Sequence, residues 1–106
     1  MKQECQLHID TTKSDKTVVI LITPTDSYTA VSPHSLLRAQ IILPSIRALL
    51  TEQGYSISDL SSITVAPGPG SFTGLRVGFA VGNMLAVLLG IPINGKQPPQ
   101  FPIYTG

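Results

Sequence analysis

The first thirty residues carry apolar and polar side chains in the patterns of three short strands. Residues 5–11 alternate between the two kinds, which is typical of a strand with one buried face. Residues 17–22 form a continuous apolar run, which predicts a strand covered on both faces, and residues 27–31 predict a weaker strand. Because the polar turns between these segments are short, we expect an antiparallel meander.

A helical pattern follows the third predicted strand. The pair Ser32 and Pro33 is a helix-start signal, with the serine at the cap and the proline at the first helical position. The apolar spacing then continues to about Gln53, and Gly54 is expected to end the helix. The predicted core-facing stripe consists of Leu36, Ala39, Ile42, Leu43, Ile46, Leu49 and Leu50.

The same helix has a second apolar patch on its far side. Leu37, Ile41 and Ala48 lie there, opposite the predicted core stripe. Single exposed apolar residues are common on protein surfaces, but a cluster opposite the core indicates an interface. We therefore take these three residues as candidate contacts with another chain.

Residues 63–90 predict a strand, a loop rich in proline and glycine, and a second helix. Each glycine inside a helix costs about 1 kcal/mol relative to alanine, so several of them need a packing reason. Apolar residues cover nearly the whole circumference, and only Arg76 and Asn83 form a narrow polar strip. Such a helix requires burial on more than one side. The small residues recur every fourth position, at Gly74, Gly78, Gly82, Ala86 and Gly90.

Together these segments predict an α/β fold. A fourth strand at 62–66 precedes the glycine loop, and the second helix leads by a crossover to a short fifth strand at 91–93. The resulting mixed five-stranded sheet with flanking helices is the ribonuclease H-like arrangement, one half of the actin-like ATPase fold. We expect one domain over residues 1–93 and an irregular, proline-rich tail over 94–106.

Composition narrows the classes of function. The chain has 106 residues and a formal charge of +1, which gives no electrostatic case for direct binding to nucleic acid or to an anionic membrane. The single cysteine, Cys5, excludes an internal disulfide and fits a reducing cytoplasm. The uncharged stretch 77–93 contains several glycines and is at the short limit for a membrane span, so we expect a buried helix there.

The residues that could take part in catalysis or ligand binding do not form a convincing catalytic set. The loop 68–74, with Gly68, Gly70 and Ser71, precedes a helix and could present backbone amides to a phosphate, but it lacks a P-loop ending. Asp10 ends the first strand, where actin-like folds place a phosphate-facing carboxylate. A single carboxylate cannot support two-metal hydrolysis, so Asp10 is expected to order the following turn. We predict no metal and no cofactor.

The glycine-rich stretch also carries a family signature. Residues 66–78 read APGPGSFTGLRVG and closely resemble the GPGSFTGLR(I/V)G motif of the TsaB (YeaZ-type) family. Residues 9–11, 42–44 and 59–65 resemble further segments of that family, so residues 5–93 match it in order. The metal-binding histidine pair of the related TsaD enzymes is absent, and Arg38 stands where TsaB relatives often carry a histidine.

The resemblance implies a noncatalytic, actin-like subunit in the cytoplasm. Such subunits pair with a TsaD-type protein through the helices of the N-terminal domain, with a TsaE-type ATPase joining the assembly. They support threonylcarbamoyl transfer to adenosine 37 of tRNA, so contact with tRNA would be indirect. The second actin-like domain of the family is absent, which makes the chain a fragment or a minimal relative. The candidate contact residues are Leu37, Ile41, Ala48, Gly74, Arg76, Gly78, Gly82, Asn83 and Ala86.

Two alternatives remain open at the level of sequence. An actin-like nucleotide-binding module would use Asp10 with Gly68, Gly70 and Ser71. A self-associating module would use the same two helices to form a homodimer. The first alternative requires binding of a nucleotide with magnesium, whereas the second requires a mass of two chains in solution.

Overall fold

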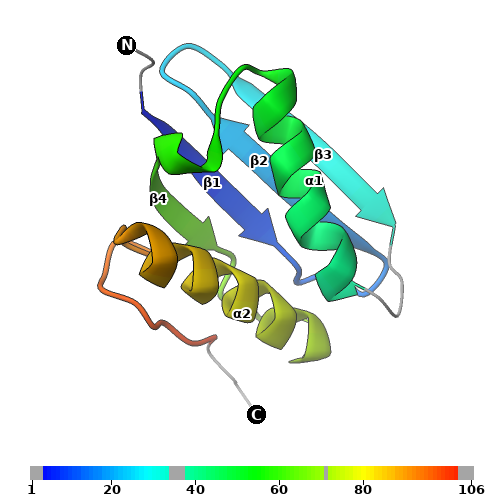
Figure 1. Cartoon of the computed structure of the whole chain (residues 1–106). Helices are drawn as coiled ribbons and strands as arrows, with labels where there is room; N and C mark the ends of the chain where they lie inside the picture. The colour runs from blue at the N-terminus through cyan, green and yellow to red at the C-terminus, as the bar shows by residue number, and fades with distance from the viewer. Residues whose placement is uncertain (1–3, 34–37, 71, 103–106) are drawn as a thin grey trace.

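The computed structural model describes residues 4–33, 38–70 and 72–102, and the chain forms a mixed sheet with helices on one face (Figure 1). The strands lie in the order β3-β2-β1-β4. Strands β1 (Cys5–Asp10), β2 (Lys16–Ile22) and β3 (Ser27–Pro33) form the expected antiparallel meander. Strand β4 (Leu60–Val65) pairs with β1 in parallel, which makes the sheet mixed.

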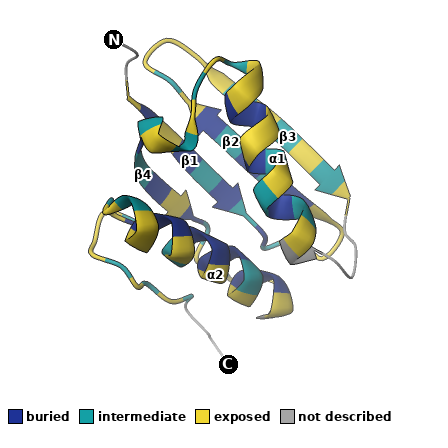
Figure 2. Cartoon of the chain, viewed as in Figure 1, coloured by how far each residue is buried: buried dark blue, intermediate teal, exposed yellow. Residues whose placement is uncertain are grey.

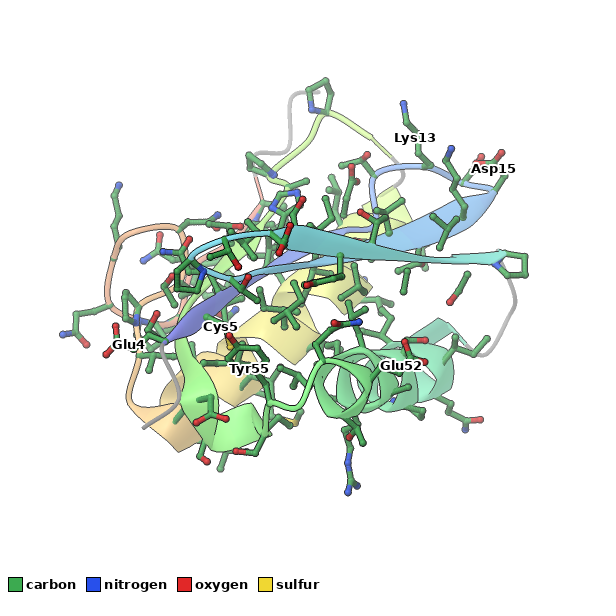
Figure 3. All side chains as sticks on the ribbon, turned by 90° about the horizontal axis from the view of Figure 1, so that it is seen from above. Glu4, Cys5, Lys13, Asp15, Glu52 and Tyr55 are labelled. Carbon is green, nitrogen blue, oxygen red and sulfur yellow. The ribbon has the colours of Figure 1, made fainter. Side chains whose placement is uncertain are left out.

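Both long helices cover the same face of this sheet. Helix α1 spans Arg38–Glu52 and helix α2 spans Phe72–Leu89, while a short 3-10 turn, η1, spans Ile57–Asp59 before β4. Figure 3, which views the sheet along its edge, places α1 and α2 together on one side of it. The alternation in β1 follows from this arrangement, because every second side chain faces the helices and is buried.

The core lies between the sheet and the two helices (Figure 2). Of the stripe predicted for the first helix, Leu43 is half-buried, Leu36 lies outside the described residues, and the side chain of Ala39 is likewise outside them. The other predicted residues, Ile42, Ile46, Leu49 and Leu50, are buried in the core, and the strands, helix α2 and Ile93 supply further buried apolar side chains. The largest fully buried side chains of the core are Leu7, Ile9, Leu21, Ile42, Ile46, Leu50, Ile63 and Ile93.

Two predictions about the secondary structure are wrong. Ser32 and Pro33 end β3, where Pro33 pairs with Lys16, and they do not start the helix. Proline is tolerated at this position because β3 is an edge strand and its outward side needs no amide. The fifth strand at 91–93 is reduced to one bridge between Ile93 and Ile63, so the described sheet has four strands.

The small residues of α2 have a packing role within the chain itself. A Cβ atom added to Gly78 would meet the hydroxyl of Thr11, and one added to Gly82 would lie 2.6 Å from Cγ2 of Val65. Ala86 is fully buried on the same face. The close approach expected for a backbone of another chain is therefore made by β1 and β4 of this chain.

We predict that Gly82→Val lowers the free energy of unfolding by about 1–3 kcal/mol, because the added side chain overpacks against Val65. The matched control is Ala80→Val on the exposed side of the same helix, for which we expect a change within about 1 kcal/mol. Urea unfolding followed by circular dichroism measures both. Equal stability of the two variants would contradict the close packing of α2 on the sheet.

Candidate functional site

Asp10 and Thr12 form a closed turn at the carboxyl end of β1. The Asp10 Oδ1 atom accepts hydrogen bonds from the Thr12 amide at 2.9 Å and from the Thr12 hydroxyl at 2.6 Å. Partial burial raises the pKa of Asp10, but the two bonds from Thr12 and the charges of His8 and Lys13 outweigh it, so the pKa is below its ordinary value. Asp10 thus orders the turn, as its position predicted.

The glycine loop packs on this same turn. A Cβ atom at Gly70 would lie 2.6 Å from the Thr12 carbonyl oxygen, so only glycine fits there. Gly68 has a φ of 104°, which also favours glycine. The structure therefore brings Gly70 next to the Asp10 turn, while Ser71 lies outside the described residues. Nothing in this geometry tests nucleotide binding, which stays a prediction.

Within residues 4–33, 38–70 and 72–102, no three His, Cys, Asp or Glu side chains are grouped in a way that could hold a metal ion. His8 points to the strand beside it, where its Nδ1 atom lies 2.7 Å from the Thr64 hydroxyl. Burial, with a smaller effect of the Asp59 charge, raises the pKa of the Cys5 thiol to about 11. Cys5 is therefore a protonated core residue at neutral pH.

The lowered pKa of Asp10 makes a prediction about acid stability. The folded state favours the ionised carboxylate, so its stabilisation is present above the ordinary pKa of 3.8 and is lost as the pH falls through the folded-state value. Asp10→Asn keeps an oxygen acceptor for Thr12 but has no titrating group. We expect wild type to lose more stability than Asp10→Asn between about pH 5 and about pH 2.

Urea unfolding at a series of pH values measures this difference. The control is Asp15→Asn, which removes a carboxylate from an exposed turn residue and should follow wild type through the acid range. Parallel pH profiles for wild type and Asp10→Asn would show that the turn gains nothing from the ionised carboxylate.

The outer face of α2 is apolar and uncovered. Met84 is 40% exposed, Val87 61% and Leu88 74%. Toward the start of the helix, this face continues into a groove of ≈ 420 Å³. The groove is lined by Thr73, Arg76, Val77, Ala80 and Val81. One side of α2 thus packs on the sheet, and the other presents a continuous apolar surface with Arg76 at its border.

The predicted contact residues divide between these two sides of α2. Arg76 is exposed on the outer side, whereas Gly74, Gly78, Gly82 and Ala86 are buried. The burial of the last three is against the sheet, because the residues of a helix at spacings of four share one face. Our reading of this ridge as a surface for another chain is replaced by packing inside this chain.

The structure describes two of the three predicted contact residues on α1. Ile41 is half-buried, Ala48 is exposed, and Leu37 lies outside the described residues. Met84, Val87 and Leu88 were not chosen from the sequence, although a signal existed: they lie on the helix side opposite the small residues. An apolar helix whose small face packs inward leaves its large residues outward.

Asn83 binds a segment of this chain. Its Nδ2 atom donates to the carbonyl oxygen of Gln100 at 2.7 Å, and its Oδ1 atom accepts from the Gln100 amide at 2.8 Å. The pair of bonds fastens the irregular segment 97–102 along α2 (Figure 1). Asn83 was expected to meet another chain, and the structure assigns its amide to the tail.

Neither helix α1 nor helix α2, nor any other helix in the described parts of the chain, has both the length and the apolar character needed to cross a bilayer. The long uncharged stretch of α2 is interrupted by the glycines that contact the sheet. Its apolar content is explained by the core on one side and by the uncovered outer face on the other.

Comparisons with known proteins place the chain in a family. The model of the family described as tRNA N6-adenosine threonylcarbamoyltransferase (TsaD) matches residues 22–95. The chain is 39% identical over 56 residues to the tRNA threonylcarbamoyladenosine biosynthesis protein TsaB of Escherichia coli K12, covering 53% of this chain and 24% of that protein. The TsaB protein of Bacillus subtilis 168 is 44% identical over 52 residues, covering 49% of this chain and 23% of the relative.

A solved structure has the same fold. YeaZ from Pseudomonas aeruginosa superimposes with a TM-score of 0.79 at 32% identity, covering 86% of this chain and 42% of that one. The likeness supports the actin-like, ribonuclease H-like class expected from the order of elements. The matched region is about a quarter of the curated relatives and less than half of the solved structure. The chain belongs to the tRNA N6-adenosine threonylcarbamoyltransferase (TsaD) family and is a protein of the TsaB, or YeaZ, type.

Proposed function

We propose that this chain is a noncatalytic partner subunit that binds a TsaD-type protein through the outer face of α2. In that complex it supports formation of threonylcarbamoyladenosine at adenosine 37 of tRNA. The observation that carries the proposal is the exposed apolar surface formed by Met84, Val87 and Leu88. The names of the TsaB relatives, which are biosynthesis proteins for this modified nucleoside, supply the pathway.

The energetic argument for a partner begins with the two sides of α2. Burial of one large apolar side chain is worth about 1.5–3 kcal/mol, so leaving three of them exposed on one helix forgoes a sizeable stabilisation. The sheet side of α2 is already filled at Gly78 and Gly82 and cannot take them. A partner helix with an apolar face, laid along Met84, Val87 and Leu88, would recover this free energy.

The border of this apolar centre is polar. The second predicted apolar patch, on α1, lies apart from it, because Ile41 and Ala48 share a helix face with Ser45, whose hydroxyl lies 3.4 Å from that of Ser32 on β3. Arg76, at the border of the groove, supplies a polar rim of the kind that surrounds apolar interface centres.

The noncatalytic character is supported by the chemistry at the carboxyl end of β1. Asp10 is engaged by Thr12, and one carboxylate does not provide a two-metal site. We infer that nucleotide chemistry belongs to the partners, namely the TsaD-type protein and a TsaE-type ATPase. The charge of +1 favours indirect contact with tRNA through the complex, which we place in the cytoplasm.

A homodimer is the second candidate, and the same observation favours it. An exposed apolar helix face can meet its own copy around a twofold axis, so Leu88 of one chain would approach α2 of the other. The two candidates differ in whether a TsaD-type protein can displace one copy of the chain from the other. A TsaD-type protein would either form a one-to-one complex with the chain or fail to separate its homodimer.

We predict that Leu88→Asp weakens binding to a TsaD-type protein of the same organism at least tenfold, because a carboxylate would be buried in the apolar contact. Leu88 is 74% exposed, so stability should change little. Val31→Asp is the matched control, since Val31 is a 59% exposed apolar residue on β3, far from the proposed surface. Isothermal titration calorimetry gives the dissociation constants.

Two results would contradict the proposal. Equal weakening by Val31→Asp and Leu88→Asp would remove the assignment of the surface to α2. Absence of binding by the wild-type chain would remove the partner role. Reconstitution of tRNA modification with and without the chain then measures its support of the reaction, and transfer activity of the chain alone would exclude a noncatalytic subunit.

A further inference from the structure

The segment after α2 closes the outer edge of β4. The Ile63 amide donates to the carbonyl oxygen of Pro92 at 3.0 Å, and the Asn94 amide donates to the carbonyl oxygen of Ile63 at 2.8 Å. At Val65 the partner is a side chain: Asn94 Oδ1 accepts from the Val65 amide at 2.7 Å, and Nδ2 donates to its carbonyl oxygen at 3.1 Å. A carboxamide has the donor and the acceptor of a peptide unit, so Asn94 replaces one residue of a neighbouring strand.

A tight turn aims the Asn94 side chain at β4. Asn94 has a φ of 52° and Gly95 a φ of 74°, and the flanking Ile93 and Lys96 exchange both backbone hydrogen bonds, at 2.9 and 3.1 Å. Positive φ at both central residues is the type I′ turn, for which Asn-Gly is the preferred sequence. The Ile93 side chain is fully buried, which anchors the turn in the core.

The sequence of β4 does not protect its outer edge, so this edge depends on the segment after α2 to cover it. Residues 60–65 read LSSITV and contain no charge and no proline, which are the usual protections of an edge strand. The β-branched residues Ile63, Thr64 and Val65 favour strand pairing. An uncovered β4 would therefore be a ready template for another strand.

We propose that the Asn94 side chain is a clasp that prevents β4 from pairing, edge to edge and antiparallel, with β4 of a second copy of this chain. The exposed groups of the edge would be the same in both copies, so a twofold pairing satisfies them reciprocally. The opposite edge, β3, does not contact the clasp, so any association through β3 would be the same in wild type and variants. The inference does not depend on the surface proposed for α2.

Asn94→Gly is the decisive variant, because glycine retains the positive φ of the turn and removes only the clasp. At a concentration low enough to keep the variant monomeric, we expect hydrogen exchange of the Val65 amide to become about tenfold faster, as follows from loss of one hydrogen bond. We also expect a rise in mass with concentration in light scattering. The control is Asn83→Ala, which breaks the matching pair of bonds to Gln100 but leaves β4 covered.

A double variant identifies the edge that associates. Thr64 is exposed on β4, so Asn94→Gly with Thr64→Lys places like charges together in the proposed pair and should return the mass to the wild-type value. A Val65 amide that exchanges at the wild-type rate in monomeric Asn94→Gly would overturn the proposal, as would association that persists with Thr64→Lys. Rapid exchange of Val65 in the wild-type chain would overturn it even if the variant failed to fold.

Discussion

The absence of side chains at Gly78 and Gly82 determines how the rest of the structure is arranged. Without Cβ atoms, α2 rests directly on Thr11 and Val65, and the sheet contacts the helix backbone. The rotation of the helix is thereby fixed, because any other face would bring larger side chains against the strands. Leu88 and its neighbours must consequently face outward. The same contact that completes the core creates the surface proposed for the partner.

The strand meander could be predicted because the periodicity in the first thirty residues is local. The helix start could not, since Ser32 and Pro33 carry a genuine start signal that pairing with β2 overrides. The predicted fifth strand is not formed for a different reason. After Ile93 the chain reverses in the Asn94 turn, a signal that was present in the sequence but was read as part of an irregular tail.

The candidate site shows where sequence reasoning stops. A helix that is apolar around its circumference does not reveal which side meets the sheet, and the small residues fitted either an internal or an external contact. Asn83 was assigned to a partner because its place on a polar strip says nothing of a tail seventeen positions later. Asp10, in contrast, was correctly expected to order its turn, because the interaction spans only two residues. The division of the chain at residue 93 and the nucleotide-facing residues stay predictions.

Methyl NMR on the wild-type chain tests the partner role of α2 most directly. Signals of Met84, Val87 and Leu88 are followed as an unlabelled TsaD-type protein is added, with the buried Ile63 and Ile93 as internal references. We predict that the three outer-face signals shift together and saturate at one equivalent while the references stay in place. Unchanged outer-face signals in the presence of a bound partner would contradict the proposed role of this face.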